Sequence, residues 1–556
     1  MITRHYVTIG NRRVHYRRAG QGPALVLLHA SPVSSEVFEE VHFPVFSKEF
    51  TVIAIDTPGQ GFSDPLNLGR QERIEDLADA LAETLEVLGV EKCGLYGRHT
   101  GASIAVEYAR RYPKRSAVVI TDGFPLFTPQ VRDDYLKNYL ADIVPDFAGS
   151  HLLWWWFRYR EQHVFWPWNK HLGANRADQD VPDLAFLQRG TREILVAGNT
   201  YKSPYAAAFL HEGIPCVEDI MKGPVPVCFG ARPGDSIYSA LKRMPKGSWV
   251  KEFHRDKRDA AMQELEIFRE HPGKGDVPPP PAAAPLPDRV TIDYLPVGGR
   301  QIAVRTAGDG PGAPIVLLHQ MPGSGKMLEP LVLELAKKRR VLAIDLPGHG
   351  DSDRTGDHSI AAQAAAVAET LAHLRLPPAH VYGHNAGASV AIELALAHPG
   401  TVASLLLEGP MVMSATDRKR FGEKWALPAD PVWDGHHLTA IWHQTRDQQI
   451  YYPWYEKTLA ASRFIEPYID PEALHARVVE MIKHPWSYKP AWDAAFAYPT
   501  RERLSEVRIP MWIGVNESDV FAACREATER LLGREVVSLD VDAKSRSKAM
   551  LAFVKD

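Results

Sequence analysis

Short apolar runs alternate with amphipathic segments along the whole chain. The apolar runs occupy residues 24–28, 52–55, 95–97 and 118–120 in the first half, and residues 315–318, 341–344, 381–383 and 405–407 in the second. Between them, residues 74–88 and 360–374 repeat apolar side chains with the period of a helix. Strands that are apolar throughout are buried on both faces, so this alternation predicts a parallel sheet with helices on either side.

A glycine-flanked turn follows the third apolar run in both halves. It reads Gly97-Arg-His-Thr-Gly101 in the first half and Gly383-His-Asn-Ala-Gly387 in the second. This pattern is typical of a nucleophile elbow, a tight strand-to-helix turn that exposes one side chain at the top of a sheet. The small flanking residues are required because the two backbones approach closely there. The exposed residue is His99 in the first copy and Asn385 in the second, in place of Ser, Cys or Asp.

The two halves match each other in order and spacing. His29 and His319 are 290 positions apart, and His99 and Asn385 are 286 positions apart. Loop changes of a few residues account for such a drift. A repeat of this length is a whole domain rather than one unit of a solenoid, so the chain is expected to be a tandem duplication.

A proline- and alanine-rich stretch at residues 272–288 separates the two copies. Such a composition favours an extended, semi-rigid linker. We therefore predict one domain at residues 1–271 and a second at residues 289–556. A chain of 556 residues is also too long for a single core.

Three motifs occur in the same order in both copies. The first copy has a His-x-x-Pro turn at His29, an Asp-x-Pro-Gly-x-Gly loop at Asp56 and the elbow at His99. In this order they resemble the α/β-hydrolase family over nearly all of both halves. The resemblance implies two tandem α/β-hydrolase domains, each with a mostly parallel, doubly wound sheet. It also implies a helical, tryptophan-rich cap in each domain, at about residues 125–222 and 411–506.

In this family a histidine and a carboxylate late in the domain serve the nucleophile. By resemblance Asp235 is the acid and His254 the histidine of the first domain, and Asp519 is the acid of the second. Residues 541–547, near the end of the second domain, contain no histidine. Loss of a triad serine lowers activity about a millionfold in measured cases, so serine-type ester hydrolysis is not expected of either domain. The second domain is predicted to be degenerate.

Three interpretations of His99 remain open. Imidazole titrates near neutral pH, so His99 can be a general base or a transient nucleophile. It can equally be a hydrogen-bonding residue of a catalytically silent pocket, or a structural histidine. Asp235 and His254 have a second interpretation as a surface pair, because His254 lies in a run of charged residues. Asn385 cannot act as a nucleophile, which leaves it a polar binding or structural role.

The resemblance also implies an oxyanion hole made of backbone N–H groups. These come from Ser31 and Thr100 in the first domain, and from Met321 and Ala386 in the second. Such donors stabilise developing negative charge whatever the nucleophile is. Asp122 lies where some family members place their acid, and it is also plausible as a turn residue or in substrate binding.

The caps share a second signature at a constant offset of 286 positions. His151, Trp156 and Arg160 lie on one predicted helix, with Trp156 and Arg160 on the same face. Trp442 and Arg446 are the counterparts in the second cap. One interpretation is ordinary cap packing with a solvated arginine. The other is an aromatic pocket in which Arg160 or Arg446 binds a carboxylate or carbonyl.

Composition narrows the possible partners. The chain is 45% hydrophobic and 24% charged with a net charge of −4, which offers no argument for nucleic acid or anionic membrane. The four cysteines have neither metal-ligand nor disulfide spacing. No dinucleotide fingerprint or phosphate loop occurs, so neither a cofactor nor a metal is expected. No signal core or long apolar segment is found, which favours a cytoplasmic protein.

These observations lead to two hypotheses of different classes. The first is a cofactor-free enzyme whose His99, Asp235 and His254 transfer protons during hydrolytic or lyase-type cleavage of a small apolar ester, lactone, carbonyl or carboxylate compound. The second is a catalytically silent receptor or pseudoenzyme that binds a small molecule, or a scaffold assembled through both domains. The sequence leaves the substrate and the oligomeric state open.

Overall fold

The computed structural model describes residues 1–286 and 289–554 as two compact units. Unit 1 comprises residues 1–144 and 155–284, and unit 2 comprises residues 145–154 and 285–556. Part of the expected linker, residues 287–288, lies outside the described residues. Its earlier part belongs to unit 1, where Arg18 donates a hydrogen bond of 3.0 Å to the Val277 carbonyl.

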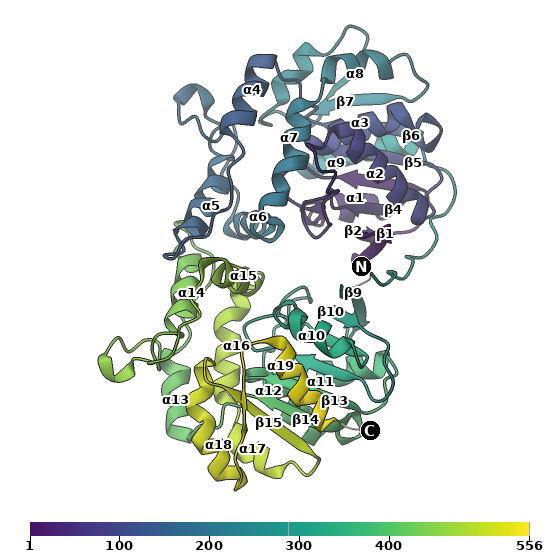
Figure 1. Cartoon of the computed structure of the whole chain (residues 1–556). Coiled ribbons are helices and arrows are strands. Elements are labelled where there is room, and N and C mark those ends of the chain that lie inside the picture. The colour runs from purple at the N-terminus through teal and green to yellow at the C-terminus, as the bar shows by residue number, and fades with distance from the viewer. Residues whose placement is uncertain (287–288, 555–556) are drawn as a thin grey trace. The chain divides into compact units, whose positions relative to one another are not determined.

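Each unit is built on one eight-stranded sheet (Figure 1). In unit 1 the spatial order is β1-β2-β4-β3-β5-β6-β7-β8, and in unit 2 it is β16-β15-β14-β13-β11-β12-β10-β9. Only the pairs β1/β2, β2/β4, β9/β10 and β10/β12 are antiparallel among the described strands. Two mostly parallel, doubly wound sheets confirm the predicted fold class.

The strands of unit 1 are β1 (Thr3–Ile9), β2 (Arg12–Ala19), β3 (Ala24–Leu28), β4 (Thr51–Ile55), β5 (Cys93–Arg98), β6 (Ser116–Asp122), β7 (Val227–Ala231) and β8 (Trp249–Glu252). Those of unit 2 are β9 (Thr291–Val297), β10 (Arg300–Ala307), β11 (Ile315–Leu318), β12 (Val341–Ile344), β13 (Ala379–His384), β14 (Val402–Glu408), β15 (Met511–Asn516) and β16 (Val537–Leu539). The apolar runs of the sequence are therefore the central strands of both sheets.

Helices cover both faces of each sheet. In unit 1 these are α1 (His42–Phe46), α2 (Ile74–Val87), α3 (Thr100–Arg111) and α9 (Lys257–Glu270). In unit 2 they are α10 (Glu329–Ala336), α11 (Ile360–His373), α12 (Ala386–Ala397), α17 (Thr500–Glu506), α18 (Arg525–Leu532) and α19 (Ala543–Phe553).

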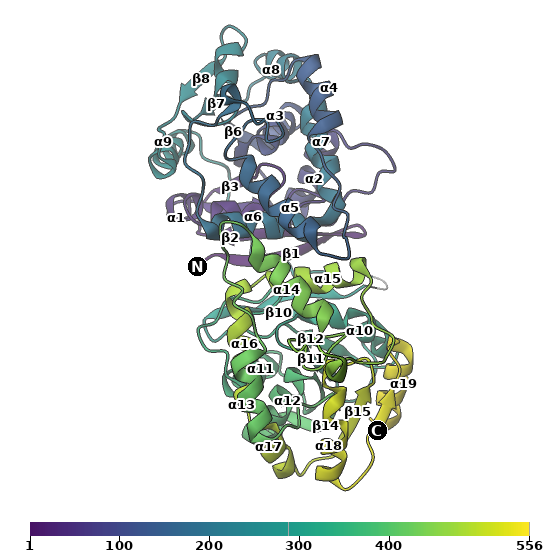
Figure 2. The same cartoon turned by 90° about the vertical axis from the view of Figure 1, so that its left-hand side faces the viewer.

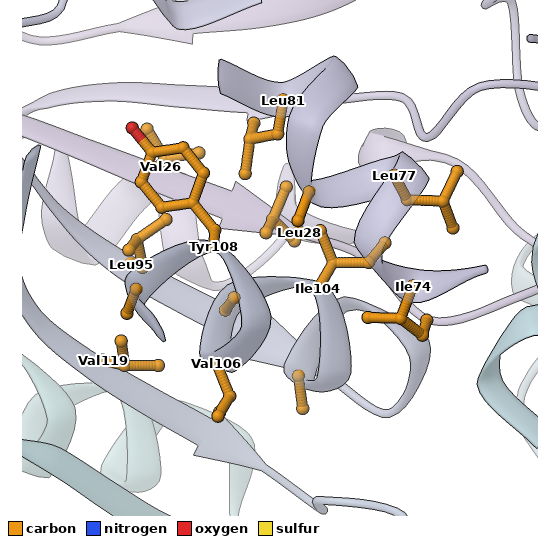
Figure 3. Packing of buried hydrophobic residues seen from close by; sticks show 14 of the residues in the cluster. Val26, Leu28, Ile74, Leu77, Leu81, Leu95, Ile104, Val106, Tyr108 and Val119 are labelled. Carbon is orange, nitrogen blue, oxygen red and sulfur yellow. The ribbon is translucent and has the colours of Figure 1, made fainter. Parts of the chain in front are cut away.

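Alternating residues of the central strands supply the two faces of the core. In β3, Val26 and Leu28 pack with α2 and α3, whereas Leu25 and Leu27 pack with α1 and α9. Figure 3 shows the first of these faces, where Leu95 of β5 and neighbouring strand residues meet the apolar sides of α2 and α3. A strand buried on both faces explains why these runs contain no polar residue.

Helices inserted between β6 and β7, and between β14 and β15, form a cap in each unit. The first set is α4 (Pro129–Asn138), α5 (Ser150–Glu161), α6 (Leu184–Ala197), α7 (Lys202–Leu210) and α8 (Gly213–Ile220), of which α5 begins in residues that cluster with unit 2. The second is α13 (Ala415–Lys424), α14 (His436–Asp447), α15 (Pro471–Ile482) and α16 (Pro485–Ala497). In two perpendicular views, α4, α5 and α7 lie together to one side of the sheet of unit 1 (Figures 1 and 2).

Among the described residues, the helices are too short or too polar to cross a lipid bilayer.

The elbow glycines make a testable prediction about stability. A Cβ atom on Gly101 would lie 2.1 Å from the Leu28 carbonyl oxygen, a backbone atom of the central sheet. Gly101→Ala should therefore lower the free energy of unfolding by at least about 2 kcal/mol, measured by denaturant unfolding. Gly173→Ala is the control, because a Cβ there would have no neighbour within 4 Å. Equal unfolding midpoints for the two variants would contradict the packing described.

Candidate functional site

The elbow turn forces a non-glycine residue into an unusual backbone conformation in both units. His99 has φ 47° and ψ −109°, and Asn385 has φ 52° and ψ −112°. Such conformations are strained and persist where the surrounding structure imposes them. Gly123, which follows β6, makes room for the His99 ring, since a Cβ there would lie 2.8 Å from the ring. The turn thus holds the His99 side chain at the carboxyl ends of the parallel strands, where this kind of sheet places its sites.

His99 is hydrogen-bonded to Asp235, which lies four residues beyond the end of β7. Its Nε2 lies 2.9 Å from Oδ1 and 3.1 Å from Oδ2 of the carboxylate. Arg98 also donates to Asp235, with Nη2 3.1 Å from Oδ2. The His99 side chain is 22% exposed, whereas that of Asp235 is buried. The structure therefore brings together two of the three residues that the sequence suggested for proton transfer.

The surroundings of Asp235 keep it ionised. Burial by itself raises the pKa of this carboxyl, but the charge and hydrogen bond of His99, then Arg98, outweigh burial and hold it well below its usual range. An ionised Asp235 accepts a hydrogen bond from Nε2–H, so the neutral imidazole carries its proton on Nε2. Nδ1 of His99 then keeps its lone pair, and it makes no hydrogen bond to any described residue.

His254 does not take part in this arrangement, which corrects the expectation of an Asp235–His254 pair. Its ring is 54% exposed and lies 3.3 Å from Asp259, and it forms neither a hydrogen bond nor an ion pair with Asp235. The cause is the loop after β8. Phe253 is buried and packs where a Cβ on Gly230 would lie, so the next side chain points outward.

Asp122 is buried under the elbow and does not face a substrate, contrary to one expectation for it. Its Oδ2 accepts hydrogen bonds from Arg232 at 2.9 Å and from the Tyr96 hydroxyl at 3.2 Å. The Arg232 guanidinium, followed by Arg98, outweighs burial and lowers the pKa of Asp122. Asp122 therefore anchors Arg232 beneath the site, and Asp235 is the acid that holds His99.

Unit 2 repeats the frame with other groups. Asn385 Nδ2 donates to Asp519 Oδ2 at 3.1 Å, and His384 Nε2 lies 2.7 Å from the same oxygen. Glu408, the counterpart of Asp122, pairs with Arg546 of α19 and accepts from the Tyr382 hydroxyl at 2.7 Å. An amide cannot accept a proton at neutral pH, so Asn385 has no role as a base. Arg546 comes from the segment in which the sequence shows no histidine.

The residues expected to form the oxyanion holes lie beside the elbows. Thr100 and Ala386 are the first residues of α3 and α12, where helix N–H groups have no partner within the helix. Ser31 is nearly buried, and its hydroxyl accepts a hydrogen bond of 2.6 Å from Gln60. Met321 is fully buried at the corresponding turn of unit 2.

The cap residues singled out from the sequence occupy structural positions. Arg160 is bonded to the adjacent Glu161 at 3.2 Å and lies over the Phe157 ring, and Arg446 is bonded to Asp447 at 3.0 Å. Neither arginine therefore points into an aromatic pocket, as one interpretation had it. The remaining three, all buried, are His151, which contacts Asp146, and the tryptophans Trp156 and Trp442.

One group of described residues has the donor set of a metal site. Ligand atoms of Glu107, His211 and Cys216 lie within 4.8 Å of one another. Arg110, however, donates to both oxygens of Glu107, at 2.9 and 2.7 Å, and the Cys216 thiol lies 3.6 Å from one of them. Burial, followed by Glu107, raises the pKa of Cys216 well above its usual value. Glu107 and Cys216 are thus satisfied in a hydrogen-bond network with a protonated thiol, whereas the buried Nδ1 of His211 has no hydrogen-bond partner among the described residues.

An open cavity of about 560 Å³ lies in unit 1 but away from the elbow. Asp142, Thr200 and Lys202 are among its lining residues, and His99 and Asp235 are not.

Comparison with known proteins places this geometry in a family. The family model described as alpha/beta hydrolase fold matches residues 23–180 and 313–449, more than half of the chain. The chain therefore belongs to the α/β-hydrolase family.

Curated relatives match a short part of the chain. A soluble epoxide hydrolase of Corynebacterium sp. (strain C12) is 38% identical over 117 residues, 21% of this chain and 39% of that protein. A pimeloyl-[acyl-carrier protein] methyl ester esterase of Methylococcus capsulatus is 41% identical over 132 residues, 24% of this chain and 44% of that protein. The chain thus spans less than half the length of these relatives.

Among solved structures, the enol-lactonase from Burkholderia xenovorans LB400 is 19% identical. It covers 47% of this chain and 100% of its own, with a TM-score of 0.36.

Several residues of the site were not found from the sequence. Arg98 and His384, both basic, directly precede the elbow residue in the two copies, 286 positions apart. Tyr96 and Tyr382 match in the same way. The recurrence of these residues at the same offset in both copies is the sequence pattern that could have identified them. Arg232 has no such counterpart, because Arg546 from a different element serves the second copy.

Behind the elbow strand β5, the structure buries a carboxyl group that is paired with no charged side chain among the described residues. Glu264 of α9 is 1% exposed, and its Oε2 is 4.0 Å from Nε2 of His42. Burial, followed by the charge of Asp122, raises the pKa of Glu264 to about 8. Burial also lowers the pKa of His42 to about 3, so both groups are neutral at pH 6.

The raised pKa of Glu264 makes stability depend on pH. The folded state holds a proton that the unfolded state releases above about pH 4.5, so stability falls as pH rises toward 8. The slope is at most about 1.4 kcal/mol per pH unit. Glu264→Gln should flatten the slope between pH 5 and 8 in denaturant unfolding. Glu266→Gln, on an exposed position of the same helix, should leave it unchanged. An equal slope in wild type and Glu264→Gln would contradict the assignment.

Proposed function

We propose that unit 1 is a cofactor-free enzyme in which His99, held by Asp235, transfers protons. The reaction is hydrolytic or lyase-type cleavage of a small apolar ester, lactone, carbonyl or carboxylate compound. One observation carries this proposal: the elbow side chain is a histidine whose Nε2 lies 2.9 Å from a buried carboxylate. A carboxylate in this position fixes the tautomer of the imidazole and stabilises the imidazolium that forms when it accepts a proton.

In the hydrolytic version, His99 acts on water. Nδ1 accepts a proton from a water molecule as the water oxygen bonds to the carbonyl carbon. The carbonyl oxygen becomes an oxyanion, and the imidazolium is stabilised by Asp235. When the tetrahedral intermediate collapses, the bond to the leaving oxygen breaks, and His99 returns its proton to that oxygen.

The backbone N–H groups of Ser31 and Thr100 are proposed to hold the oxyanion. They need no nucleophilic side chain to do so, because such donors act on the charge that develops on the substrate. The position of Thr100 at the start of α3 supports this role, since the helix N-terminus favours negative charge.

The relatives support hydrolysis as the reaction class. Two of them are named a soluble epoxide hydrolase and a pimeloyl-[acyl-carrier protein] methyl ester esterase, and both names denote hydrolysis. The partner we propose for unit 1 is a small-molecule substrate.

A binding function is the second candidate, and the site of unit 2 favours it. Asn385 and His384 both use Asp519, so that carboxylate is occupied and the elbow residue cannot accept a proton. We propose that unit 2 is catalytically silent and serves stability or ligand binding.

The enzyme hypothesis predicts different outcomes for three variants. His99→Gln should abolish turnover, because an amide cannot replace the base, whereas Asn385→Ala should leave it unchanged. His254→Ala should also retain activity, since its ring is exposed and paired with Asp259. The measurement is a screen of small esters and lactones with product detection by mass spectrometry.

Asp235→Asn tests how much the carboxylate that holds His99 contributes to turnover. It should lower turnover about 10⁴-fold by favouring the wrong tautomer, as in the comparable substitution of a serine protease. If ligands stabilise the protein but are recovered unchanged in every case, the binding function is correct and the enzyme hypothesis is wrong.

A further inference from the structure

The cap of unit 1 contains a buried arginine that the proposed reaction does not use. Arg158 of α5 is 2% exposed. Its Nη1 donates to Gln162 at 2.5 Å, but Nε and Nη2 have no hydrogen-bond acceptor among the described residues. Buried charges are normally paired, and unmatched donors are unfavourable. Two N–H groups of a buried cation are thus available to an anionic acceptor.

Aromatic rings surround this guanidinium. Its Cζ lies 5.2 Å from the centre of the Tyr139 ring and 5.1 Å from that of Trp168. The Tyr205 hydroxyl donates to the Tyr139 hydroxyl at 3.2 Å, and the Phe209 ring is 5.5 Å from that of Tyr139. We call Arg158, Tyr139, Trp168, Tyr205 and Phe209 the Arg158 cage. Rings stabilise the cation without supplying a negative charge.

Unit 2 contains the same cage without its cation and its two tyrosine hydroxyls. Trp168 donates its indole N–H to the Tyr139 carbonyl at 3.1 Å, and Trp454 donates to the Trp425 carbonyl at 2.9 Å, so these positions correspond. Gln444 replaces Arg158 at the same offset of 286, which leaves a neutral group there.

The two tyrosines of the Arg158 cage are also replaced in unit 2. Tyr139 corresponds to Trp425, and Tyr205 corresponds to Trp492, whose ring is 5.8 Å from that of Trp425. The cation and both hydroxyls are therefore confined to the unit that has the histidine elbow. Cap packing alone does not require them, because the second cap packs without them.

His163, just after α5, has its pKa lowered to about 3 by burial first and then by the charges of Arg98 and, further down, Arg158. Arg98 is the residue beside His99 that binds Asp235. His163 is therefore neutral, and it lies close enough to Arg98 and to Arg158 for both charges to lower its pKa.

We propose that the Arg158 cage binds the carboxylate of a small organic acid whose apolar part lies against the aromatic rings. Nε and Nη2 of Arg158 present two N–H groups on one edge of the guanidinium, which suits the two oxygens of a carboxylate. The Tyr139 hydroxyl, which accepts a hydrogen bond from Tyr205, can donate its own hydrogen to the carboxylate. The claim that this acid is part of a substrate of His99 rests on the proposed function. The claim that the Arg158 cage binds a carboxylate does not depend on it.

The test uses the full chain with phenylacetate as the probe and phenylacetamide as its neutral analogue. Phenylacetate should raise the melting temperature and bind in calorimetry, and phenylacetamide should bind at least 10-fold more weakly. Arg158→Gln introduces the residue that unit 2 has at this position, and it should weaken phenylacetate binding at least 10-fold. Arg160→Gln, two residues along the same helix on a partly exposed side chain, is the matched control and should bind as wild type.

Tyr205→Phe keeps the ring and removes only a hydroxyl, so it tests the site if Arg158→Gln does not fold. This variant should weaken phenylacetate binding several-fold. Equal affinity for acid and amide, or unchanged phenylacetate affinity in Arg158→Gln and in Tyr205→Phe, would overturn the proposal. His99→Gln should keep phenylacetate binding. Binding without turnover of any carboxylate-bearing ester would refute the proposed function and leave the Arg158 cage intact.

Discussion

The close approach of a strand and a helix at the elbow is the constraint on which both units depend. Gly97 and Gly101 allow β5 and α3 to meet, since a Cβ on Gly97 would lie 2.2 Å from the Gly101 carbonyl oxygen. This contact leaves the residue between them in a strained conformation with its side chain exposed above the sheet. The same contact recurs at Gly383 and Gly387. Both units therefore hold one side chain at this turn, partly exposed for His99 and buried for Asn385, and its chemistry is free to vary.

The two copies use that freedom differently. In unit 1 the displayed group is an imidazole facing a carboxylate, which can accept and return a proton. In unit 2 it is an amide facing the same kind of carboxylate, which cannot. The supporting arginine also changes its origin, from Arg232 near β7 to Arg546 on α19, while the tyrosine beneath the elbow is kept. The frame is thus conserved between the copies, and the charges around it are rearranged.

Burial determines the electrostatic character of unit 1. Asp122 and Asp235 are ionised although buried, because Arg232, Arg98 and His99 lie within hydrogen-bonding distance of them. A buried carboxyl or guanidinium group that has no oppositely charged partner must be stabilised in another way. Glu264 takes up a proton, whereas an arginine cannot release one and instead needs an anion or aromatic rings. The same rule therefore explains the fixed charges below the elbow and the unmatched cation in the cap.

The sequence by itself determined the duplication, the doubly wound sheets and the two elbow residues, because apolar runs and glycine spacing are local patterns with local structural causes. Only the tertiary structure decided which groups meet. It placed Phe253 inside and His254 outside, and so left Asp235 to His99. It also turned Arg158 inward and Arg160 outward on a helix with aromatic residues on every side. Such choices depend on which surface a neighbouring element covers, and the spacing of residues along one chain does not contain that information.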